Sequence, residues 1–249
     1  MLRGMLKCDF HMHCSEDPHD VLEHDAVDLI NHAAERGYHV LAITLHGRLY
    51  CPDELRRYAA SRGILLIPGI ELYVERREVL LLGAGPDDIP KIKCFDDLLA
   101  FKKTQKDGVL VIAPHPFYGL GQYVGDKLEA FADLFDALEF CHFYTRWWNP
   151  NRKAEVVAQK LGKPMIACSD THRLQWMNFH YSLVDAEPTR ESVFAAIRAG
   201  KFQNRTRPLT MLEFIAKVAW HVGVNDRRKF ECRMGWMKRP LKPCKPIPV

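Results

Sequence analysis

The sequence predicts an α/β barrel built on parallel strands, and three observations predict it. Short apolar segments alternate with amphipathic helical segments from residue 5 to about residue 200. The chain has 249 residues and is 47% hydrophobic, which suits one sizeable core, and so many strand–helix units favour one barrel over two domains. Residues able to bind metal ions follow most of the predicted strands. In a parallel barrel these positions meet at one mouth.

Seven segments are predicted to be strands because each is a short apolar run between polar or turn residues. They span residues 6–10, 40–44, 64–67, 79–82, 109–113, 137–141 and 164–168. We expect the strands that start near residues 6, 40, 64, 109, 137 and 164 to run parallel in one barrel.

The helical segments carry apolar residues at helical spacing and often end before a glycine. They span residues 21–36, 52–62, 95–106, 127–135, 151–161 and 190–199. The pattern then changes. Residues 210–222 predict one more amphipathic helix, and four prolines between Arg239 and Val249 predict an extended stretch. We therefore predict a barrel domain over residues 1–204 and a C-terminal extension over residues 205–249.

Charge distinguishes the extension from the barrel. Residues 205–249 hold eleven basic and three acidic side chains, a net charge of +8, whereas residues 1–204 carry a net charge of −4. A basic segment can bind nucleic acid or an acidic partner. The alternatives are a solvated tail or a strap across the acidic body, and the spacing of the charges favours these alternatives.

Several classes of protein do not fit the sequence. No apolar run is long enough to cross a membrane, and residues 1–9 lack the apolar core of a signal peptide, so we expect a cytoplasmic protein without a membrane partner. The eight cysteines include no Cys-x-x-Cys pair, which gives a zinc ribbon no support. Gly-x-Ser-x-Gly, P-loop and dinucleotide-binding glycine motifs are absent.

The ends of the predicted strands carry the chemistry. His11 and His13 end the first strand, and alternate side chains of a strand share a face, so the two imidazoles point the same way. The later strands are followed by His46, Glu71, His115, His142, and by Asp170 with His172. Burying so many polar groups without a ligand would be costly, so the pattern predicts a shared metal site.

The types of ligand indicate the reaction. Imidazoles mixed with carboxylates suit Zn, Mn or Fe, and Glu71 is able to bridge two ions. Two or three divalent ions lying a few ångströms apart can activate a water molecule and bind a phosphoryl group, so no side chain needs to act as the nucleophile. The sequence therefore predicts a metal-dependent hydrolase of phosphate esters.

The order of the motifs resembles the PHP (polymerase and histidinol phosphatase) family over about residues 5–200. The resemblance rests on the His11-x-His13 pair, the acidic turn of residues 15–20, and residues 42–46, 68–71, 114–116 and 169–172. It implies a distorted (β/α)7 TIM-like barrel, up to three metal ions, and phosphoesterase activity, often on nucleotides, phosphorylated sugars or amino-alcohol phosphates.

The resemblance also implies a set of ligands. One ion would be held by His11, His13, Glu71 and Asp170. A second ion would share Glu71 and use His115. A third would use His46, His172 and an acidic residue of the turn, where the spacing favours Asp20 over Asp17.

Two departures from the family pattern affect this set. Leu45 stands where the family has an acid before the histidine, which predicts a less firmly oriented His46. No histidine occurs between Val74 and Gly83, where the family often supplies a ligand to the second ion. Glu78 or His142 could fill that role, or no residue does.

Substrate contacts are less specific in the sequence. Arg48, Arg146 and Arg173 each follow a candidate ligand and are expected to bind the substrate phosphate, with surface salt bridges as the alternative. His24, in or beside the first helix, is expected at the surface. We expect a small phosphorylated metabolite or nucleotide as the substrate. The alternatives are a nuclease-like phosphodiesterase and a non-catalytic protein that binds a metal or a partner.

Overall fold

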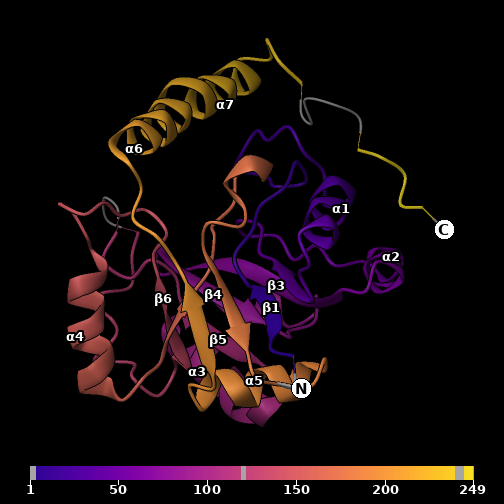
Figure 1. Cartoon of the computed structure of the whole chain (residues 1–249). Helices are drawn as coiled ribbons and strands as arrows, with labels where there is room; N and C mark the ends of the chain where they lie inside the picture. The colour runs from indigo at the N-terminus through magenta and orange to yellow at the C-terminus, as the bar shows by residue number, and fades with distance from the viewer. Residues whose placement is uncertain (1–3, 119–121, 239–243, 249) are drawn as a thin grey trace.

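A nine-stranded sheet lies at the centre of the part of the chain that this computed structural model describes, residues 4–118, 122–238 and 244–248. The sheet curls into a nearly closed barrel (Figure 1), which confirms the predicted fold class. Its strand order is β7-β6-β5-β4-β3-β2-β1-β8-β9. The strands are β1 (Leu6–Asp9), β2 (Val40–Ile43), β3 (Leu65–Val74), β4 (Arg77–Leu82), β5 (Leu110–Ala113), β6 (Ala137–Phe140), β7 (Met165–Ala167), β8 (Tyr181–Val184) and β9 (Phe202–Arg205).

The six strands expected to be parallel do share one direction. Strand β4 runs against them between β3 and β5, because Glu75 and Arg76 turn the chain back in a tight hairpin with φ angles of 47° and 67°. Strands β8 and β9 were not predicted. Strand β9 is polar and alternates half-buried with exposed residues, and β8 alternates half-buried with buried residues, so neither has the apolar run of the other strands. Strand β8 pairs antiparallel with β1.

Side chains close the barrel between its two edge strands. Asn204 of β9 donates to the carbonyl of Met165 at 2.8 Å and accepts from the amide of Ala167 at 2.9 Å. Ser182 of β8 also accepts from the Ala167 amide, at 3.1 Å. These bonds bring β7 beside β8 and β9, so the end of β7 lies near the end of β1, where Met12 and Thr171 form a parallel bridge.

Helices flank the sheet, and most match the predicted segments. They are α1 (Ala26–Glu35), α2 (Asp53–Ser61), α3 (Phe95–Gln105), α4 (Asn151–Leu161) and α5 (Arg190–Arg198), with short turns η1 (Ile89–Lys91), η2 (Lys106–Gly108) and η3 (Leu174–Trp176). Helix α1 begins five residues later than predicted because Asp25 caps it, accepting from the amide of Asp28 at 2.8 Å. The helix predicted over residues 127–135 is wrong. This short segment forms turns that bury Leu128, Leu134 and Phe135.

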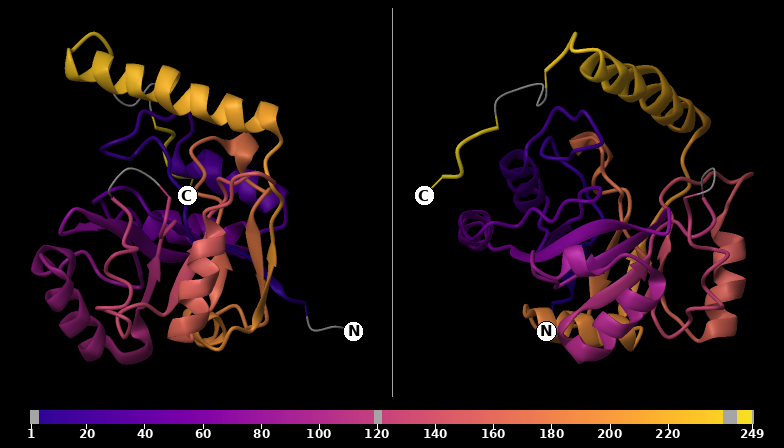
Figure 2. Two further views of the ribbon diagram at one scale, coloured as in Figure 1. Left: turned by 90° about the vertical axis from the view of Figure 1, so that its left-hand side faces the viewer. Right: turned by 180° about the vertical axis from the view of Figure 1, so that it is seen from behind.

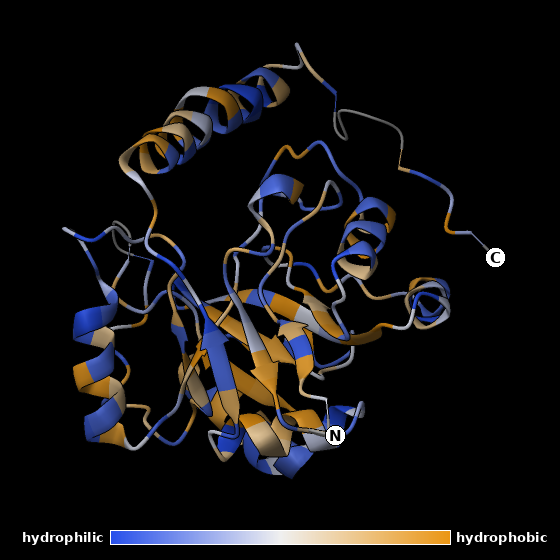
Figure 3. Cartoon of the chain, in the orientation of Figure 1, coloured by the Kyte–Doolittle hydropathy of each residue, from blue (hydrophilic) through white to orange (hydrophobic). Residues whose placement is uncertain are grey.

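The core lies inside the barrel and between the sheet and its helices. Figure 3 shows the strands as the most apolar part of the chain. Inside the barrel, Phe10, Leu82, Ile112 and Phe194 belong to one fully buried cluster. This packing gives the strands a rigid base, so the residues that follow them start from well-defined positions.

The C-terminal extension forms a helical rod that crosses above the barrel (Figure 2). It consists of α6 (Met211–Val218), a π-helical segment η4 (Ala219–Asn225) and α7 (Asp226–Arg233), so it continues eleven residues beyond the predicted helix of residues 210–222. Of the predicted extended stretch, residues 239–243 and 249 lie outside the described residues, and residues 244–248 form neither helix nor strand. None of the described helices combines the length and apolar character needed to cross a membrane. The division at residue 204 remains a prediction.

Candidate metal centre

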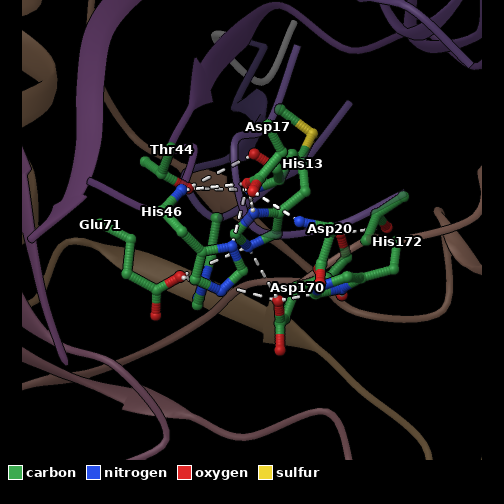
Figure 4. Close-up of polar contacts among 12 residues, drawn as sticks. His13, Asp17, Asp20, Thr44, His46, Glu71, Asp170 and His172 are labelled. Atoms are coloured by element: carbon green, nitrogen blue, oxygen red, sulfur yellow. Dashed lines mark hydrogen bonds and ion pairs between the residues drawn. The ribbon is translucent and has the colours of Figure 1, made fainter. Parts of the chain in front are cut away.

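Three buried side chains and the half-buried Asp170 direct one atom each toward a common point at the carboxyl ends of the strands (Figure 4 labels three of the four). His11 and His13 follow β1, Glu71 lies in β3, and Asp170 follows β7. Their converging atoms are His11 Nε2, His13 Nε2, Glu71 Oε2 and Asp170 Oδ1. The histidine nitrogens lie 3.3 and 3.5 Å from the Glu71 oxygen, and 3.4 and 3.3 Å from the Asp170 oxygen.

These distances fit a divalent cation. Four ligands at roughly 2.0–2.2 Å from a tetrahedral ion lie about 3.3–3.6 Å from one another. All four atoms are buried and have no hydrogen-bond partner among the described residues. Buried polar atoms rarely stay unsatisfied in folded proteins, and a cation would satisfy all four at once.

Carboxylates orient the two imidazoles from behind. His11 Nδ1 donates to Glu139 Oε2 at 2.9 Å, and His13 Nδ1 donates to Asp17 Oδ2 at 3.0 Å. With Nδ1 carrying the proton, each Nε2 presents a lone pair to the centre. The sequence reasoning missed Glu139, although a single carboxylate inside the apolar segment of β6 was a usable signal. His24 was also misjudged. It is 5% exposed and bonds the carbonyl of His13 at 2.8 Å.

Asp17 acts on two histidines at once. Its Oδ2 also accepts from His46 Nδ1 at 2.9 Å and from the His46 amide at 3.0 Å, while Oδ1 accepts from the amides of His19 and Asp20 at 2.7 and 3.0 Å. Burial raises the pKa of Asp17, but the bonds from His13 and His46 outweigh it and hold the pKa well below its usual range. The expectation that Leu45 leaves His46 without an acidic partner is therefore wrong, because Asp17 replaces that acid.

A second group of ligand types lies on the side of the acidic turn. His172 Nε2 is 2.7 Å from Asp20 Oδ2, and His46 Nε2 is 3.3 Å from Glu71 Oε2. The rings of His13 and His172 stack with centroids 4.4 Å apart. The structure thus brings His46, His172 and Asp20 beside the first four residues.

A third group lies on the side of β4. His115 Nε2 is 3.6 Å from Glu71 Oε1 and 3.9 Å from Glu78 Oε2. Glu78 is only 8% exposed, so it faces the barrel interior and not solvent. Burial, followed by the charge of Glu71, raises its pKa, which indicates a position that favours added positive charge. His142 lies elsewhere, with Nδ1 4.0 Å from Asp170 Oδ2.

The backbone and the electrostatics both mark the cluster as a specialised site. His115 and Asp170 have positive φ angles of 26° and 44°, a strained conformation that tends to occur at functional sites. Burial lowers the pKa of His115, but bonding to Glu71 and the charges of Glu139 and Glu78 raise it to about 9. The carboxylates therefore draw positive charge toward the centre of the cluster.

The three arginines expected to bind substrate differ in their surroundings. Arg48 is exposed and donates to the carbonyl of Glu16 at 3.0 Å. Arg146 is exposed. The guanidinium group of Arg173 lies over the rings of Trp176 and Trp220, at 5.5 and 5.9 Å from their centroids. Their role in substrate binding remains a prediction.

Sequence comparisons relate the chain to known proteins over part of its length. Residues 148–202 match a family model described as PHP-associated. Over 120 residues, the chain is 28% identical to an uncharacterised protein of Methanocaldococcus jannaschii, which covers 48% of this chain and 67% of that protein.

Solved structures share the fold at low sequence identity. A two-domain protein of Bacteroides vulgatus, described as containing a "predicted PHP-like metal-dependent phosphoesterase", is 19% identical with a TM-score of 0.62, over 82% of this chain and 65% of that one. PsfC of Pseudomonas syringae is 14% identical with a TM-score of 0.62, over 88% and 97%. The lesion-specific endonuclease EndoQ of Pyrococcus furiosus is 12% identical with a TM-score of 0.54, over 80% and 57%.

The chain spans less than two thirds of the length of the Bacteroides and Pyrococcus proteins. At these identities the structural matches concern the fold, and the matched PHP-associated segment falls within the same barrel. In its barrel, in this segment and in the order of its histidine and carboxylate motifs, the chain is similar to proteins of the PHP family.

Proposed function

We propose that the chain is a metal-dependent hydrolase of phosphate esters that acts on a small phosphorylated metabolite or nucleotide. The observation that carries the proposal is the set of four buried, unsatisfied atoms of His11, His13, Glu71 and Asp170 at 3.3–3.5 Å. The descriptions of two proteins with this fold, a metal-dependent phosphoesterase and an endonuclease, support the same class of reaction.

Two or three divalent ions of Zn, Mn or Fe would occupy the cluster. The first would bind the four atoms just named. The second would bind Glu71, His115 and Glu78, because His115 lies 3.6 and 3.9 Å from the two carboxylates. The third would bind His46, His172 and Asp20, because His172 lies 2.7 Å from Asp20. We favour Asp20 over Asp17 because both oxygens of Asp17 already accept hydrogen bonds. We favour Glu78 over His142 because Glu78 lies beside His115.

Bound divalent ions would neutralise the charge of a phosphoryl group and make a water molecule more acidic. The protein holds the ligands in place through Glu139 and Asp17, whose bonds fix the tautomers of the histidines. Thiol nucleophiles are disfavoured, because burial raises the pKa of Cys14, Cys141 and Cys168 well above its usual range and keeps the thiols protonated. The geometry therefore favours attack by water.

Nucleic-acid cleavage is the second candidate, because the extension is basic. Several of its cations, however, pair with the acidic body. Lys229 lies 2.6 Å from Asp20, Arg228 lies 2.6 Å from Glu23, and Lys245 pairs with Asp28. These pairs support the interpretation of the extension as a strap, and they leave fewer charges to bind a phosphate backbone. We therefore favour a small substrate.

The test is turnover after metal removal and reconstitution. We expect the chelator-treated protein to be inactive toward an aryl phosphate, and Zn, Mn or Fe to restore hydrolysis. A panel of nucleotides, sugar phosphates and oligonucleotides then separates the two candidates. Equal rates with and without metal would contradict the proposal. Metal binding without hydrolysis of any member of the panel would favour a non-catalytic protein.

Replacing Glu78 by alanine tests the second ion. We expect this change to weaken one metal equivalent by about ten- to a hundredfold and to spare the others, because the position would keep only Glu71 and His115. Titration with Mn should show the effect more clearly than titration with Zn, since a carboxylate favours the harder ion.

Glu75→Ala is the matched control. It removes the same charge from the same hairpin, but its carboxylate faces the Phe95 amide and Lys127. If Glu78→Ala binds every equivalent as the wild type does, Glu78 is not a ligand, and the role passes to His142 or to no residue.

A further inference from the structure

Lys217 of helix α6 is a buried cation without an anionic partner. Only 2% of the residue is exposed, although lysine is one of the residues least often buried. Within the described part of the chain, no carboxylate oxygen lies within 4.0 Å of its ammonium nitrogen, which instead lies over the ring of Trp176, 4.6 Å from the ring centroid. Such a position costs free energy unless an anion joins it.

Ring contacts connect Lys217 to the metal centre, because the Trp176 ring beside its ammonium group packs against Trp220, whose ring centroid lies 6.3 Å from that of His172. Burial lowers the pKa of Lys217 to about 8, and the largest opposing effect is its attraction to Asp170. The charge of Lys217 in turn lowers the pKa of the buried His142, after the larger effect of burial. Asp170 therefore has a larger electrostatic effect on this ammonium group than any other carboxylate, and Asp170 is a candidate metal ligand.

The helical rod is anchored beside the same centre. Asn225 of η4 donates to Asp20 at 3.1 Å, and Lys229 of α7 pairs with Asp20 at 2.6 Å. Trp220 packs edge-on against Trp176, with ring centroids 5.2 Å apart. Figure 2 shows the rod lying across one end of the barrel. Contacts with Asp20 and Trp176 thus fix the position of the rod that carries Lys217.

We infer that Lys217 binds the phosphate group of the substrate, so that helix α6 completes the phosphate pocket of the metal centre. The inference rests on the proposed function. An ammonium group offers three donors to phosphate oxygens, and such charge-assisted bonds are strong in a buried site. A bound divalent ion would offset the charge of Asp170 and so weaken its attraction for the Lys217 ammonium group. A bound phosphate would then supply the negative charge that the ammonium group lacks.

The experiment measures binding of inorganic phosphate to the metal-loaded full chain by calorimetry. We expect Lys217→Met to weaken phosphate binding by about ten- to a hundredfold, the loss of one hydrogen bond to a charged group, and Lys217→Arg to retain most of the affinity. Arg227→Met is the control, because it removes one positive charge from an exposed position of the same rod. Metal content should be equal in all four proteins.

Two further measurements separate binding from a structural role. Lys217→Met should raise KM for an aryl phosphate more than it lowers kcat, and its Tm should not fall, because the change removes an unpaired buried charge. A Tm that falls in Lys217→Met and recovers in Lys217→Arg, with equal phosphate affinity throughout, would assign Lys217 to holding Trp176 and overturn the inference. So would a metal-loaded wild type that binds no phosphate.

Phosphate binding needs no turnover, so the two proposals can fail separately. A chain that binds phosphate through Lys217 but hydrolyses no ester contradicts the proposed function and retains the pocket. A chain that hydrolyses esters, with the phosphate affinity and KM of Lys217→Met unchanged, contradicts the role of Lys217 alone.

Discussion

Asp170→Asn is expected to release the ion at the centre of the cluster and to lower phosphate-ester turnover by more than about a hundredfold, the upper range for losing an outer partner of a metal ligand. Asp170 Oδ1 lies 3.4 and 3.3 Å from His11 and His13, so its charge acts at the centre of the proposed site. An amide would keep the shape of the side chain and remove that charge. Metal content by elemental analysis and turnover of an aryl phosphate measure the two effects.

Asparagine is the suitable replacement because the backbone at residue 170 has a φ of 44°. Asparagine and aspartate tolerate this left-handed conformation better than alanine, so the variant should stay folded. Asp185→Asn is the control, since it removes the same charge from an exposed position. Full metal content and full activity in Asp170→Asn would remove Asp170 from the proposed ligands, whatever the remaining residues do.

Asp17→Asn is expected to weaken metal binding by about a hundredfold, although Asp17 is not a proposed ligand. Loss of one carboxylate behind a metal-binding histidine typically costs ten- to a hundredfold in affinity or activity, and Asp17 supports both His13 and His46. The variant replaces one carboxylate oxygen by an amide nitrogen, which cannot accept a hydrogen bond. Its side chain therefore cannot accept from both imidazoles and also from the backbone amides of His19 and Asp20. We therefore expect two of the metal equivalents to weaken together.

Metal titration of Asp17→Asn beside Glu78→Ala measures this coupling. The two variants should affect different equivalents, because Asp17 supports His13 and His46 while Glu78 lies beside His115. If Asp17→Asn weakens binding of only the ion proposed for His46, then metal binding by His13 does not depend on Asp17. If it weakens binding of none of the ions, the proposed orienting role of Asp17 is wrong.

The sequence alone was sufficient to predict the barrel and the positions of most candidate ligands. The strands that lead to His11, Glu71, His115 and Asp170 were recognisable because a short apolar run between polar or turn residues is a local property of the chain. Their convergence followed from topology, since the carboxyl ends of parallel strands in a barrel meet at one mouth. The order of the motifs, which resembles that of the PHP family, is also evident from the sequence alone.

Only the tertiary structure decided what supports those residues. The hairpin at Glu75 and Arg76 turns Glu78 into the barrel, a direction that its short strand does not reveal. His11 is oriented by Glu139, 128 positions further along the chain, and Lys217 lies over the ring of Trp176, 41 positions earlier in the chain. Local sequence determines which face of a strand a side chain occupies. The partner of an imidazole nitrogen or of a buried ammonium group depends on distances across the barrel, which no local pattern encodes.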